Sequence, residues 1–423
     1  MLRIIFFWCS QLLGPPSLRL SDASCFACLL AKHDPSFLER KITMQKLHSR
    51  PAVVTGILEL HPKGYGFLRD PGCNLQRRPA DPFVSQATIN RLDLRIGATI
   101  TGQIDTRRQS RSGPRIRQVD LVEGLSVSDY QQTVAFDDLR AASPESQLKL
   151  EHPDQPLSMR LIDLVCPIGL GQRALIAAPP RAGKTTLLNQ MARSISWNHP
   201  DVVIKILLID ERPEEVTEIS DQNLGDVYAS NLDEPPESHA QLANLTMHHC
   251  RRIAESGKDV VLFVDSLTRL ARAMNKLPQR NGTTGSGGLN TRALDFPKKL
   301  FGSGRRLTAG GSLTLLASVL IETDNRMDEV IFREFKGTGN MDLVLNQRLA
   351  DQRIWPAIDI QQSATRRVEL LQDAETLSAV TALRRSLLSS DCVTATRDLV
   401  EKMKRFPSNA AFIDLIHTAI KAT

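Results

Sequence analysis

The sequence predicts an α/β domain built on a parallel sheet and preceded by a small all-β barrel. Three observations support this fold class. Residues 173–190 read as an apolar strand, a loop ending in Gly-Lys-Thr and a helix; further apolar strands end in carboxylates; and short alternating strands follow one another in residues 51–125. We therefore divide the chain into an N-terminal extension (1–50), a barrel (51–125), a linker (126–155) and an α/β domain (156–423).

The composition is that of a globular protein with a separate basic module. The chain has 423 residues, 41% of them apolar and 24% charged, which is enough for a sizeable core and two or three domains. Its seven cysteines show no regular spacing, and the lone pair Cys25 and Cys28 lacks the second pair that a structural zinc site needs. Residues 41–120 contain 14 Lys or Arg against 6 Asp or Glu, a net charge of +8, whereas the whole chain carries +6. This local excess favours a polyanionic partner, although a solvated basic face has the same composition.

The chain opens with MLRIIFFWCSQLLGPP, an apolar run followed by prolines. The run is similar to a signal peptide, but it has no clear small-residue cleavage site and is too short to span a bilayer. We expect residues 1–50 to form a poorly ordered extension, and translation from Met44 is an alternative.

Five short strands are predicted in the basic module, at 54–60, 65–68, 81–85, 98–104 and 116–122. Five strands at this spacing favour an OB-type barrel. Tyr65 and Phe67 are two residues apart in one strand, so their rings share a face, while Gly66 leaves space on the opposite face. Rings beside Lys63 and Arg69 suit single-stranded nucleic acid, because bases stack on the rings while cations meet phosphates. The alternative is that Tyr65 and Phe67 fill the barrel.

A phosphate-binding loop is predicted at Ala178-Pro179-Pro180-Arg181-Ala182-Gly183-Lys184-Thr185. The general pattern is G-x-x-x-x-G-K-[ST], and Ala178 replaces the first glycine. Backbone N–H groups of such a loop cradle the phosphates of ATP, Lys184 reaches the β- and γ-oxygens, and Thr185 holds Mg²⁺. The context fits this assignment, because strand 174–177 precedes the loop and the apolar positions 187, 188, 191 and 195 share one helical face after it.

Two further strands are expected to bring carboxylates to the same edge of the sheet. Residues 259–265 form an apolar strand that ends in Asp265, and strand 206–209 precedes Asp210 and Glu211. Because parallel sheets bind ligands at the C-terminal edge, we assign Asp265 to the Mg²⁺ site and Glu211 to activation of the attacking water. A solvated strand end is the alternative for Glu211. Strands at 313–321 and 357–360 complete a predicted sheet of at least five members.

Longer stretches of the chain resemble the transcription termination factor Rho family. They cover roughly residues 52–420 and read GYGFLRD, PIGLGQRALIAAPPRAGKTTLL, LLIDERPEEVTEI, VVLFVDSLTRLARAMN, MDEVIFREFKGTGNMDL and PAIDIQQSATRR. The resemblance implies a cold-shock-like OB-fold barrel followed by a RecA-type P-loop ATPase domain. It also implies a homohexamer, with ATP between neighbouring subunits, that works as an RNA-dependent ATPase and 5′–3′ helicase and terminates transcription.

The resemblance assigns roles to individual residues. Arg212 would respond to the γ-phosphate, and Arg366 would reach the neighbouring subunit's site, where such an arginine is worth about 10³–10⁵ in rate. Trp355 would pack on adenine, with an ordinary core aromatic as the alternative. The implied nucleotide-binding residues are Pro179, Pro180, Arg181, Ala182, Gly183, Lys184, Thr185, Thr186 and Trp355, with Thr185 and Asp265 at the metal. The implied RNA-binding residues are Tyr65, Phe67, Arg69, Asp81, Gly287, Gly288, Thr323 and Arg326.

The chain departs from the family pattern in three places. Residues 1–50 do not resemble the helical subdomain that commonly precedes the barrel. Loop 278–290, by composition a flexible connection, should face a central pore together with Glu322, Thr323 and Arg326; Thr283 and Arg326 stand where lysines are common, and Arg280 is near in sequence. Segment 106–117 carries arginines in place of a glutamate and an aromatic that help to select cytosine. We hypothesise a weaker cytosine preference, which competition between C-rich and A-rich oligomers at fixed salt tests.

These features predict an ATP-driven RNA translocase in the cytoplasm, with ATP and Mg²⁺ as its ligands and no membrane partner. Only the family resemblance indicates RNA polymerase as a partner. A rotary-type ATPase subunit is one alternative, because it shares the core sheet and the interfacial arginine but lacks the basic barrel. An RNA-binding protein with a vestigial ATPase is the other, although Lys184, Glu211, Asp265 and Arg366 are all present.

Overall fold

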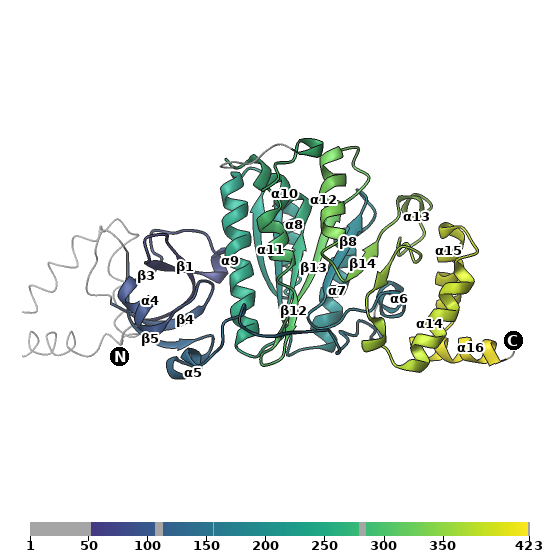
Figure 1. The fold of residues 1–423 in the computed structure, drawn as a ribbon, viewed down its shortest axis with the longest axis horizontal. Coiled ribbons are helices and arrows are strands. Elements are labelled where there is room, and N and C mark those ends of the chain that lie inside the picture. Colours follow the sequence, from purple (N-terminus) through teal and green to yellow (C-terminus); the bar gives the residue numbers. More distant parts are fainter. Residues whose placement is uncertain (1–51, 106–112, 155, 279–284, 422–423) are drawn as a thin grey trace, which may run out of the picture. The chain divides into compact units, whose positions relative to one another are not determined.

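The computed structural model describes residues 52–105, 113–154, 156–278 and 285–421 (Figure 1). The predicted extension 1–50, residues 106–112 of the arginine-rich segment, Arg280 and Thr283 lie outside the described residues. Residues Val53–Thr423 belong to one compact unit.

A closed barrel forms the first part of this unit. Its strands lie in the order β3-β2-β1-β4-β5, and pairing of β3 with β5 closes the cylinder. Their bounds are β1 (Val53–Leu60), β2 (Gly66–Arg69), β3 (Phe83–Val84), β4 (Thr99–Asp105) and β5 (Arg115–Val122), followed by β6 (Leu125–Ser126) on the edge. The five predicted strands are confirmed, and helices α4 (Gln86–Leu92) and α5 (Val127–Gln131) complete the module. Gly66 is required here, because a β carbon would lie 2.7 Å from Leu58 Cδ1 in the barrel core.

The second part is an α/β domain around a nine-stranded sheet. Six strands run in parallel in the order β10-β9-β11-β13-β8-β14, and β15, β12 and β7 add antiparallel pairs. The parallel strands are β8 (Arg173–Ala178), β9 (Val203–Glu211), β10 (Asp226–Asn231), β11 (Val260–Asp265), β13 (Ser312–Leu320) and β14 (Met341–Val344); the others are β7 (Ala141–Ala142), β12 (Arg305–Leu307) and β15 (Ala364–Thr365). The predicted α/β class is thus confirmed.

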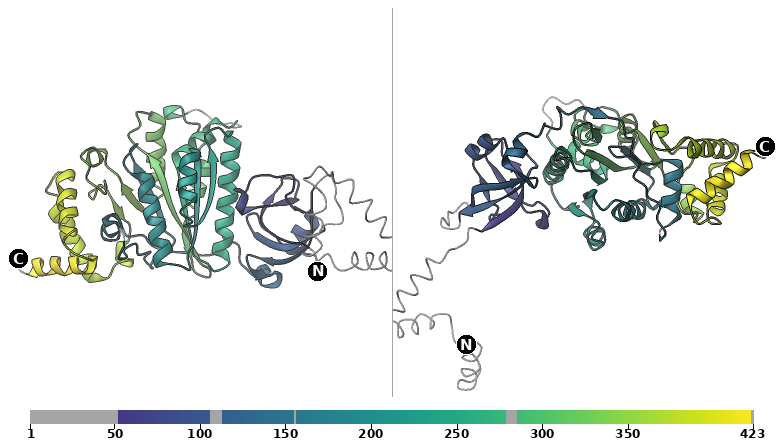
Figure 2. Two further views of the ribbon diagram at one scale, coloured as in Figure 1. Left: turned by 180° about the vertical axis from the view of Figure 1, so that it is seen from behind. Right: turned by 90° about the horizontal axis from the view of Figure 1, so that it is seen from below.

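Helices cover both faces of this sheet, as the front and back views show (Figures 1 and 2). Alternate residues of β8 face two separate cores: Ala174 and Ile176 pack towards α7, and Leu175 and Ala177 pack towards α9 and α10. Burial on both faces explains why these strands are apolar throughout. The bounds are α6 (Leu157–Val165), α7 (Lys184–Asn198), α8 (Pro213–Ser220), α9 (Pro236–Glu255), α10 (Leu267–Lys276), α11 (Asp295–Phe301), α12 (Arg326–Lys336), α13 (Gln347–Asp351), α14 (Ala374–Leu387), α15 (Cys392–Met403) and α16 (Asn409–Lys421).

Two organisational predictions differ from the structure. The strand predicted at 357–360 is wrong: this buried segment makes one isolated bridge, between Ile358 and Leu345, and β14 takes the place beside β8. The chain turns after Asp359 instead of continuing as a strand, because the Asp359 carboxylate accepts the N–H groups of Gln361 and Gln362, both at 3.0 Å. The predicted linker 126–155 also contains structure, since its strand β7 pairs with β12 and extends the large sheet.

Candidate ATPase and RNA-binding sites

The phosphate-binding loop follows β8 and leads directly into α7. Arg181 (φ +65°) and Gly183 (φ +84°) adopt the left-handed conformation that turns the chain before the helix. Helix α7 begins at Lys184, so its first backbone N–H groups point back into the loop, where anions bind. The predicted apolar face of α7, residues 187, 188, 191 and 195, is buried as expected.

Lys184 and Asp265 lie together at the C-terminal edge of the sheet. The Lys184 ammonium donates a hydrogen bond to Asp265 Oδ1, which also accepts from the Ser318 hydroxyl at 2.9 Å. Asp265 ends β11 and is 2% exposed. Lys184, predicted to bind phosphate, and Asp265, predicted to bind the metal, therefore meet across strand β13. This strand lies between β8 and β11 and carries Ser318.

Glu211 ends β9 at the same edge and is buried, with 2% of its surface exposed. Its Oε2 pairs with Arg269 at 2.7 Å, and Arg269 also donates to the Asp210 backbone oxygen. Burial opposes the charge of Arg269, but the hydrogen bond and charge of Glu211 raise the pKa of the guanidinium overall. Glu211 is therefore a held carboxylate and not the solvated strand end of the alternative.

Two charged residues, Arg212 and Glu215, lie near Glu211 at the start of α8. Arg212 is the exposed N-cap of α8, and its N–H donates to Glu211 Oε1 at 3.3 Å. Partial burial and the neighbouring charge of Glu211 raise the pKa of Glu215. Arg212 is therefore an exposed cation at the start of α8, directly after Glu211 in the chain.

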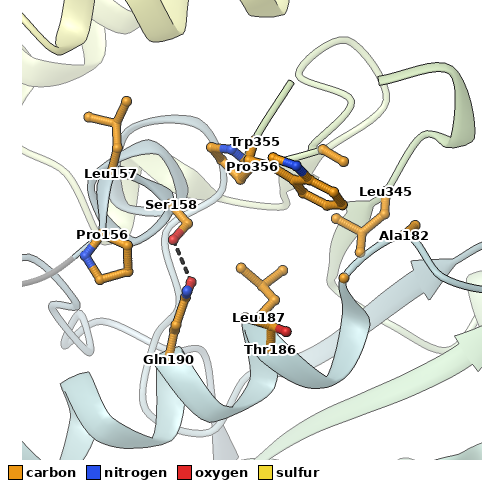
Figure 3. Close-up of a pocket in the computed structure, with 12 residues that line it drawn as sticks. Pro156, Leu157, Ser158, Ala182, Thr186, Leu187, Gln190, Leu345, Trp355 and Pro356 are labelled. Carbon is orange, nitrogen blue, oxygen red and sulfur yellow. Dashed lines mark hydrogen bonds between the residues drawn. The ribbon is translucent and has the colours of Figure 1, made fainter. Parts of the chain in front are cut away.

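A cavity of about 350 Å³ lies beside the loop and is suited to a flat base (Figure 3). Trp355 forms one wall, and Leu187 of α7 faces it from the other side. The Ser158 hydroxyl donates to Gln190 Oε1 at 2.6 Å and supplies a polar group at one end. Trp355 is 44% exposed, so it is not the core aromatic of the alternative. The remaining lining residues include Pro156, Leu157, Ala182, Gly183, Thr186, Leu345 and Pro356.

Arg366 lies at the opposite end of the sheet from the loop of its own chain. It follows β15, and its N–H donates to the Asn340 oxygen at 2.9 Å, next to the start of β14. The six residues of β8 separate this level from the phosphate-binding loop, a distance of about 20 Å at 3.3 Å per residue. The exposed Arg366 side chain therefore does not serve the site of its own chain.

The two predicted pore loops are neighbours. Gly287 (φ +70°) packs so closely on the other loop that a β carbon would lie 3.0 Å from the Arg326 oxygen. Thr323 donates to Asp328 Oδ2 at 2.7 Å, and Asp328 pairs with Arg272 of α10. Arg326 itself is exposed at the start of α12, and Gly288 accepts a hydrogen bond from Asn275 at 3.2 Å.

The barrel presents a set of aromatic rings, which we call the aromatic platform: His61, Tyr65, Phe67 and Phe83. His61 stacks on Tyr65 with centroids 4.4 Å apart, and Phe83 lies 5.5 Å from Tyr65 and 5.7 Å from Phe67. All four rings are half-buried and none belongs to the barrel core. The alternative that Tyr65 and Phe67 fill the barrel therefore does not hold.

Arg69 differs from the expectation that it meets phosphate. Its side chain is 6% exposed and pairs with both Glu59 and Asp81, while its guanidinium carbon lies 5.1 Å from the Phe67 ring centre. Asp81 also accepts the Arg78 N–H at 2.8 Å. In this structure the Arg69 guanidinium contacts the Phe67 ring, and Glu59 and Asp81 balance its charge.

Sequence reasoning missed several residues that the fold adds to these sites. Phe83 and His61 carry a weak signal, since Phe83 lies within predicted strand 81–85 and His61 directly follows predicted strand 54–60. Arg269 lies one helical turn beyond the strand that ends in Asp265, and a basic residue there gives no sign that it will meet Glu211. Ser158 and Gln190 gave no signal, because their pairing depends on how α6 packs on α7.

The donors at the sheet edge fit Mg²⁺. A hydroxyl at Thr185 and a carboxylate at Asp265 are hard oxygen ligands, and Mg²⁺ in nucleotide sites takes one or two protein oxygens besides phosphates and waters. Within the described residues there is no cluster of three or more His, Cys, Asp or Glu side chains that could hold a metal alone. The same ranges contain no helix of the length and apolarity needed to cross a membrane.

Comparison with known proteins agrees with both halves of the structure. Residues 54–128 match the family model "Rho termination factor, RNA-binding domain", and residues 158–365 match "ATP synthase alpha/beta family, nucleotide-binding domain". A type III secretion system ATPase of pathogenic bacteria has a similar structure, with a TM-score of 0.52 and 27% identity over 60% of this chain and 71% of that chain. The ATP synthase subunit NeqB (TM-score 0.50, 18% identity) shares the fold over 59% of this chain and 62% of that chain.

Curated relatives cover nearly the whole of the described chain. The transcription termination factors Rho of Rhodopirellula baltica, Chromobacterium violaceum and Aquifex aeolicus are each 42% identical to it. The matches cover 86%, 85% and 89% of this chain and 71%, 87% and 87% of the relatives, respectively. A barrel matched by the Rho RNA-binding model decides against the rotary-type alternative, and the chain belongs to the transcription termination factor Rho family.

Proposed function

We propose that this protein hydrolyses ATP to pull single-stranded RNA through a homohexameric ring, acting as an RNA-dependent ATPase and 5′–3′ helicase in the cytoplasm. Its action would release the transcript from RNA polymerase and so terminate transcription. One observation carries the proposal. The phosphate-binding lysine, the metal acid and a held carboxylate converge on one sheet edge, in a chain whose barrel presents the aromatic platform.

The geometry supports a hydrolysis mechanism in which each group has one task. Lys184 leaves Asp265 to bind the β- and γ-phosphates, and the loop N–H groups orient them. Thr185 and Asp265 would hold Mg²⁺, which neutralises phosphate charge when bound. Glu211 accepts a proton from the attacking water, and Arg212 contacts the γ-phosphate from the N-terminus of α8.

The position of Arg366 supports assembly of the site between subunits. This side chain lies about 20 Å from its own loop, so only the loop of a second copy is accessible to it. An arginine contributed by a neighbour stabilises the charge that develops on the γ-phosphate. In a ring of identical subunits, every phosphate-binding loop has the Arg366 of a neighbouring subunit beside it. A closed homo-oligomer therefore suits this topology.

Two regions are suited to hold RNA at successive points. The aromatic platform can stack bases, at about 1–3 kcal/mol each. The neighbouring loops that contain Gly287, Gly288, Thr323 and Arg326 would grip the strand in the pore, with Arg326 supplying the exposed charge.

ATP hydrolysis by the purified full chain, with and without single-stranded RNA of mixed sequence, tests the proposal. We expect RNA to stimulate turnover, Lys184→Ala to abolish it, and Tyr65→Ala with Phe67→Ala to weaken the stimulation. Trp197→Ala is the matched control, because Trp197 is an aromatic ring that is 63% exposed on α7, away from the platform. RNA binding without stimulated turnover would favour the RNA-binding protein with a vestigial ATPase.

A further inference from the structure

A loop of the barrel is bonded to the edge of the large sheet. The barrel and the sheet belong to one compact unit, and β10 is an edge strand of the sheet. In the loop between β2 and β3 (residues 70–82), the Asn74 amide N–H donates to the Ala229 backbone oxygen of β10 at 2.5 Å. Asn74 Oδ1 accepts the Ala229 N–H at 2.7 Å. The Asn74 side chain therefore bonds to β10 as a further strand would.

The backbone around Asn74 is suited to this contact. Asn74 adopts the left-handed conformation (φ 56°, ψ 32°), which asparagine tolerates better than most residues. The next residue, Leu75, is 5% exposed and packs in the same apolar core as Leu245 of α9. A pair of hydrogen bonds and a buried apolar side chain thus attach the loop to the α/β domain.

An ion pair links the same loop to the aromatic platform. Arg77 pairs with Glu59 at 2.6 Å, and Glu59 lies opposite Phe67 on the same face of the barrel sheet. The Arg77 side chain is 59% exposed, and Glu59 has Arg69 as a second partner at 2.6 Å. An exposed ion pair adds little stability, so a phosphate of RNA on the platform can replace Glu59 as the partner of Arg77. Arg77 therefore has two alternative partners, and RNA decides between them.

A small cavity gives the loop room to move. It measures about 170 Å³ and lies between the loop and α9. Asn74, Arg77 and Glu59 line it on the barrel side, and Ala229 and Gln241 line it on the other side. Because the packing is incomplete there, the loop can shift with Arg77 without a steric clash against the α/β domain.

Strand β10 connects this contact to the candidate catalytic carboxylate. Ala229 pairs with Leu208 of β9, and two residues further on Asn231 pairs with Glu211. The register shifts between Ser230 and Asn231, so the ladder is irregular directly beside Glu211. Strands that share a hydrogen-bonded ladder move together, so a displacement of β10 at Ala229 reaches the backbone that carries Glu211.

We propose that Asn74 is a positioning residue for hydrolysis, which transmits the binding of RNA on the aromatic platform to Glu211 through β10. Phosphate draws Arg77 away from Glu59, the loop shifts, and the hydrogen bonds of Asn74 carry the shift to β10. This inference rests on the proposed function, because it needs both an RNA-binding barrel and a water-activating Glu211. The path runs from the barrel and does not use the pore loops.

ATP hydrolysis by the full chain over a range of single-stranded RNA concentrations tests this inference. RNA binding without nucleotide and hydrolysis without RNA are measured in parallel. Asn74→Gly removes the amide and suits the left-handed backbone. We expect maximal RNA stimulation to fall about tenfold, within the usual range for coupling between two sites. RNA affinity and RNA-independent hydrolysis should be retained, because the change leaves the aromatic platform and the phosphate-binding loop intact.

Two further variants separate the hydrogen bonds from the backbone. Asn223→Gly is the matched control, because Asn223 is also left-handed (φ 50°) and precedes β10, but its side chain donates to the Asp221 oxygen at 3.2 Å. It should keep the full stimulation. Asn74→Asp is nearly identical in shape and keeps the acceptor for the Ala229 N–H, but it loses the donor. Stimulation should fall in this variant too.

A combined variant distinguishes a transmitting residue from one that only supports the fold. When Tyr65→Ala and Phe67→Ala are already present, Asn74→Gly should lower the remaining stimulation no further, because that remainder does not pass through the platform. Reductions that multiply, unchanged stimulation in both Asn74 variants, or an equal fall in Asn223→Gly would overturn the inference. A parent protein whose hydrolysis does not respond to RNA would instead refute the proposed function.

Discussion

The pair between Arg269 and Glu211 leads to a quantitative prediction. Replacing Arg269 by glutamine leaves a carboxylate that is 2% exposed without its counter-ion. Breaking a buried pair in this way costs about 3–5 kcal/mol, because the remaining charge is buried without a partner. Under the proposed function, hydrolysis should fall as well, because the Glu211 carboxylate is no longer held in place for the attacking water.

The assay is urea unfolding, with ATP hydrolysis measured in parallel in the absence of urea. We expect Arg269→Gln to lose about 3–5 kcal/mol of unfolding free energy and most of its ATP hydrolysis. Arg272→Gln is the matched control: it lies on the same helix and also pairs with a buried carboxylate, Asp328, which is 1% exposed. It should lose similar stability and keep the RNA-independent part of the hydrolysis. Unchanged stability in Arg269→Gln, or an equal loss of RNA-independent hydrolysis in both variants, would refute the reasoning.

Three further predictions concern assembly, packing and pH. Arg366→Ala and Lys184→Ala should each be inactive, whereas subunits of the two variants mixed and reassembled should recover about a quarter of the turnover, because some interfaces then combine an intact loop with an intact arginine; no recovery would contradict a shared site. Gly66→Ala should lose about 1–3 kcal/mol in urea unfolding, since its β carbon would lie 2.7 Å from the nearest atom, and Gly337→Ala, with nothing within 4 Å, should lose none. Burial raises the pKa of Asp163 to about 7, so between about pH 4 and 7 the folded protein binds more protons than the unfolded one. Stability should therefore fall by up to about 4 kcal/mol as the pH rises through that window. Asp163→Asn should flatten this dependence in urea unfolding.

The candidate catalytic edge was predictable because its signals are local. A strand, a loop and a helix contiguous in sequence place Lys184, and apolar strands deliver Glu211 and Asp265 to one edge. The absent first glycine also has a local explanation. Ala178 is the buried last residue of β8 in ordinary strand conformation, and the turns that need a left-handed backbone fall later, at Arg181 and Gly183.

The errors arose where long-range pairing decides the outcome. Residues 357–360 alternate as a strand would, but the position beside β8 goes to β14, whose preceding residue Asn340 accepts hydrogen bonds from the Arg173 N–H and the Gln172 side chain, both at 2.8 Å. Arg69 lies beside the Phe67 ring as expected, but its burial was not foreseen. The sequence does not show that the pairing of β1 with β2 will bring Glu59 to it.

Helix α10 connects the elements on which the proposed motor depends. It begins two residues after Asp265, and Arg269, Arg272 and Asn275 follow at intervals of three, which places them along one side of the helix. Each of these residues contacts a different part. Arg269 pairs with Glu211, Arg272 pairs with Asp328 of α12, which accepts a hydrogen bond from Thr323, and Asn275 donates to the Gly288 oxygen. Under the proposed function, RNA that displaces either loop acts on a rigid element that also orients the water-activating carboxylate. Hydrolysis would then depend on RNA without any contact between RNA and ATP.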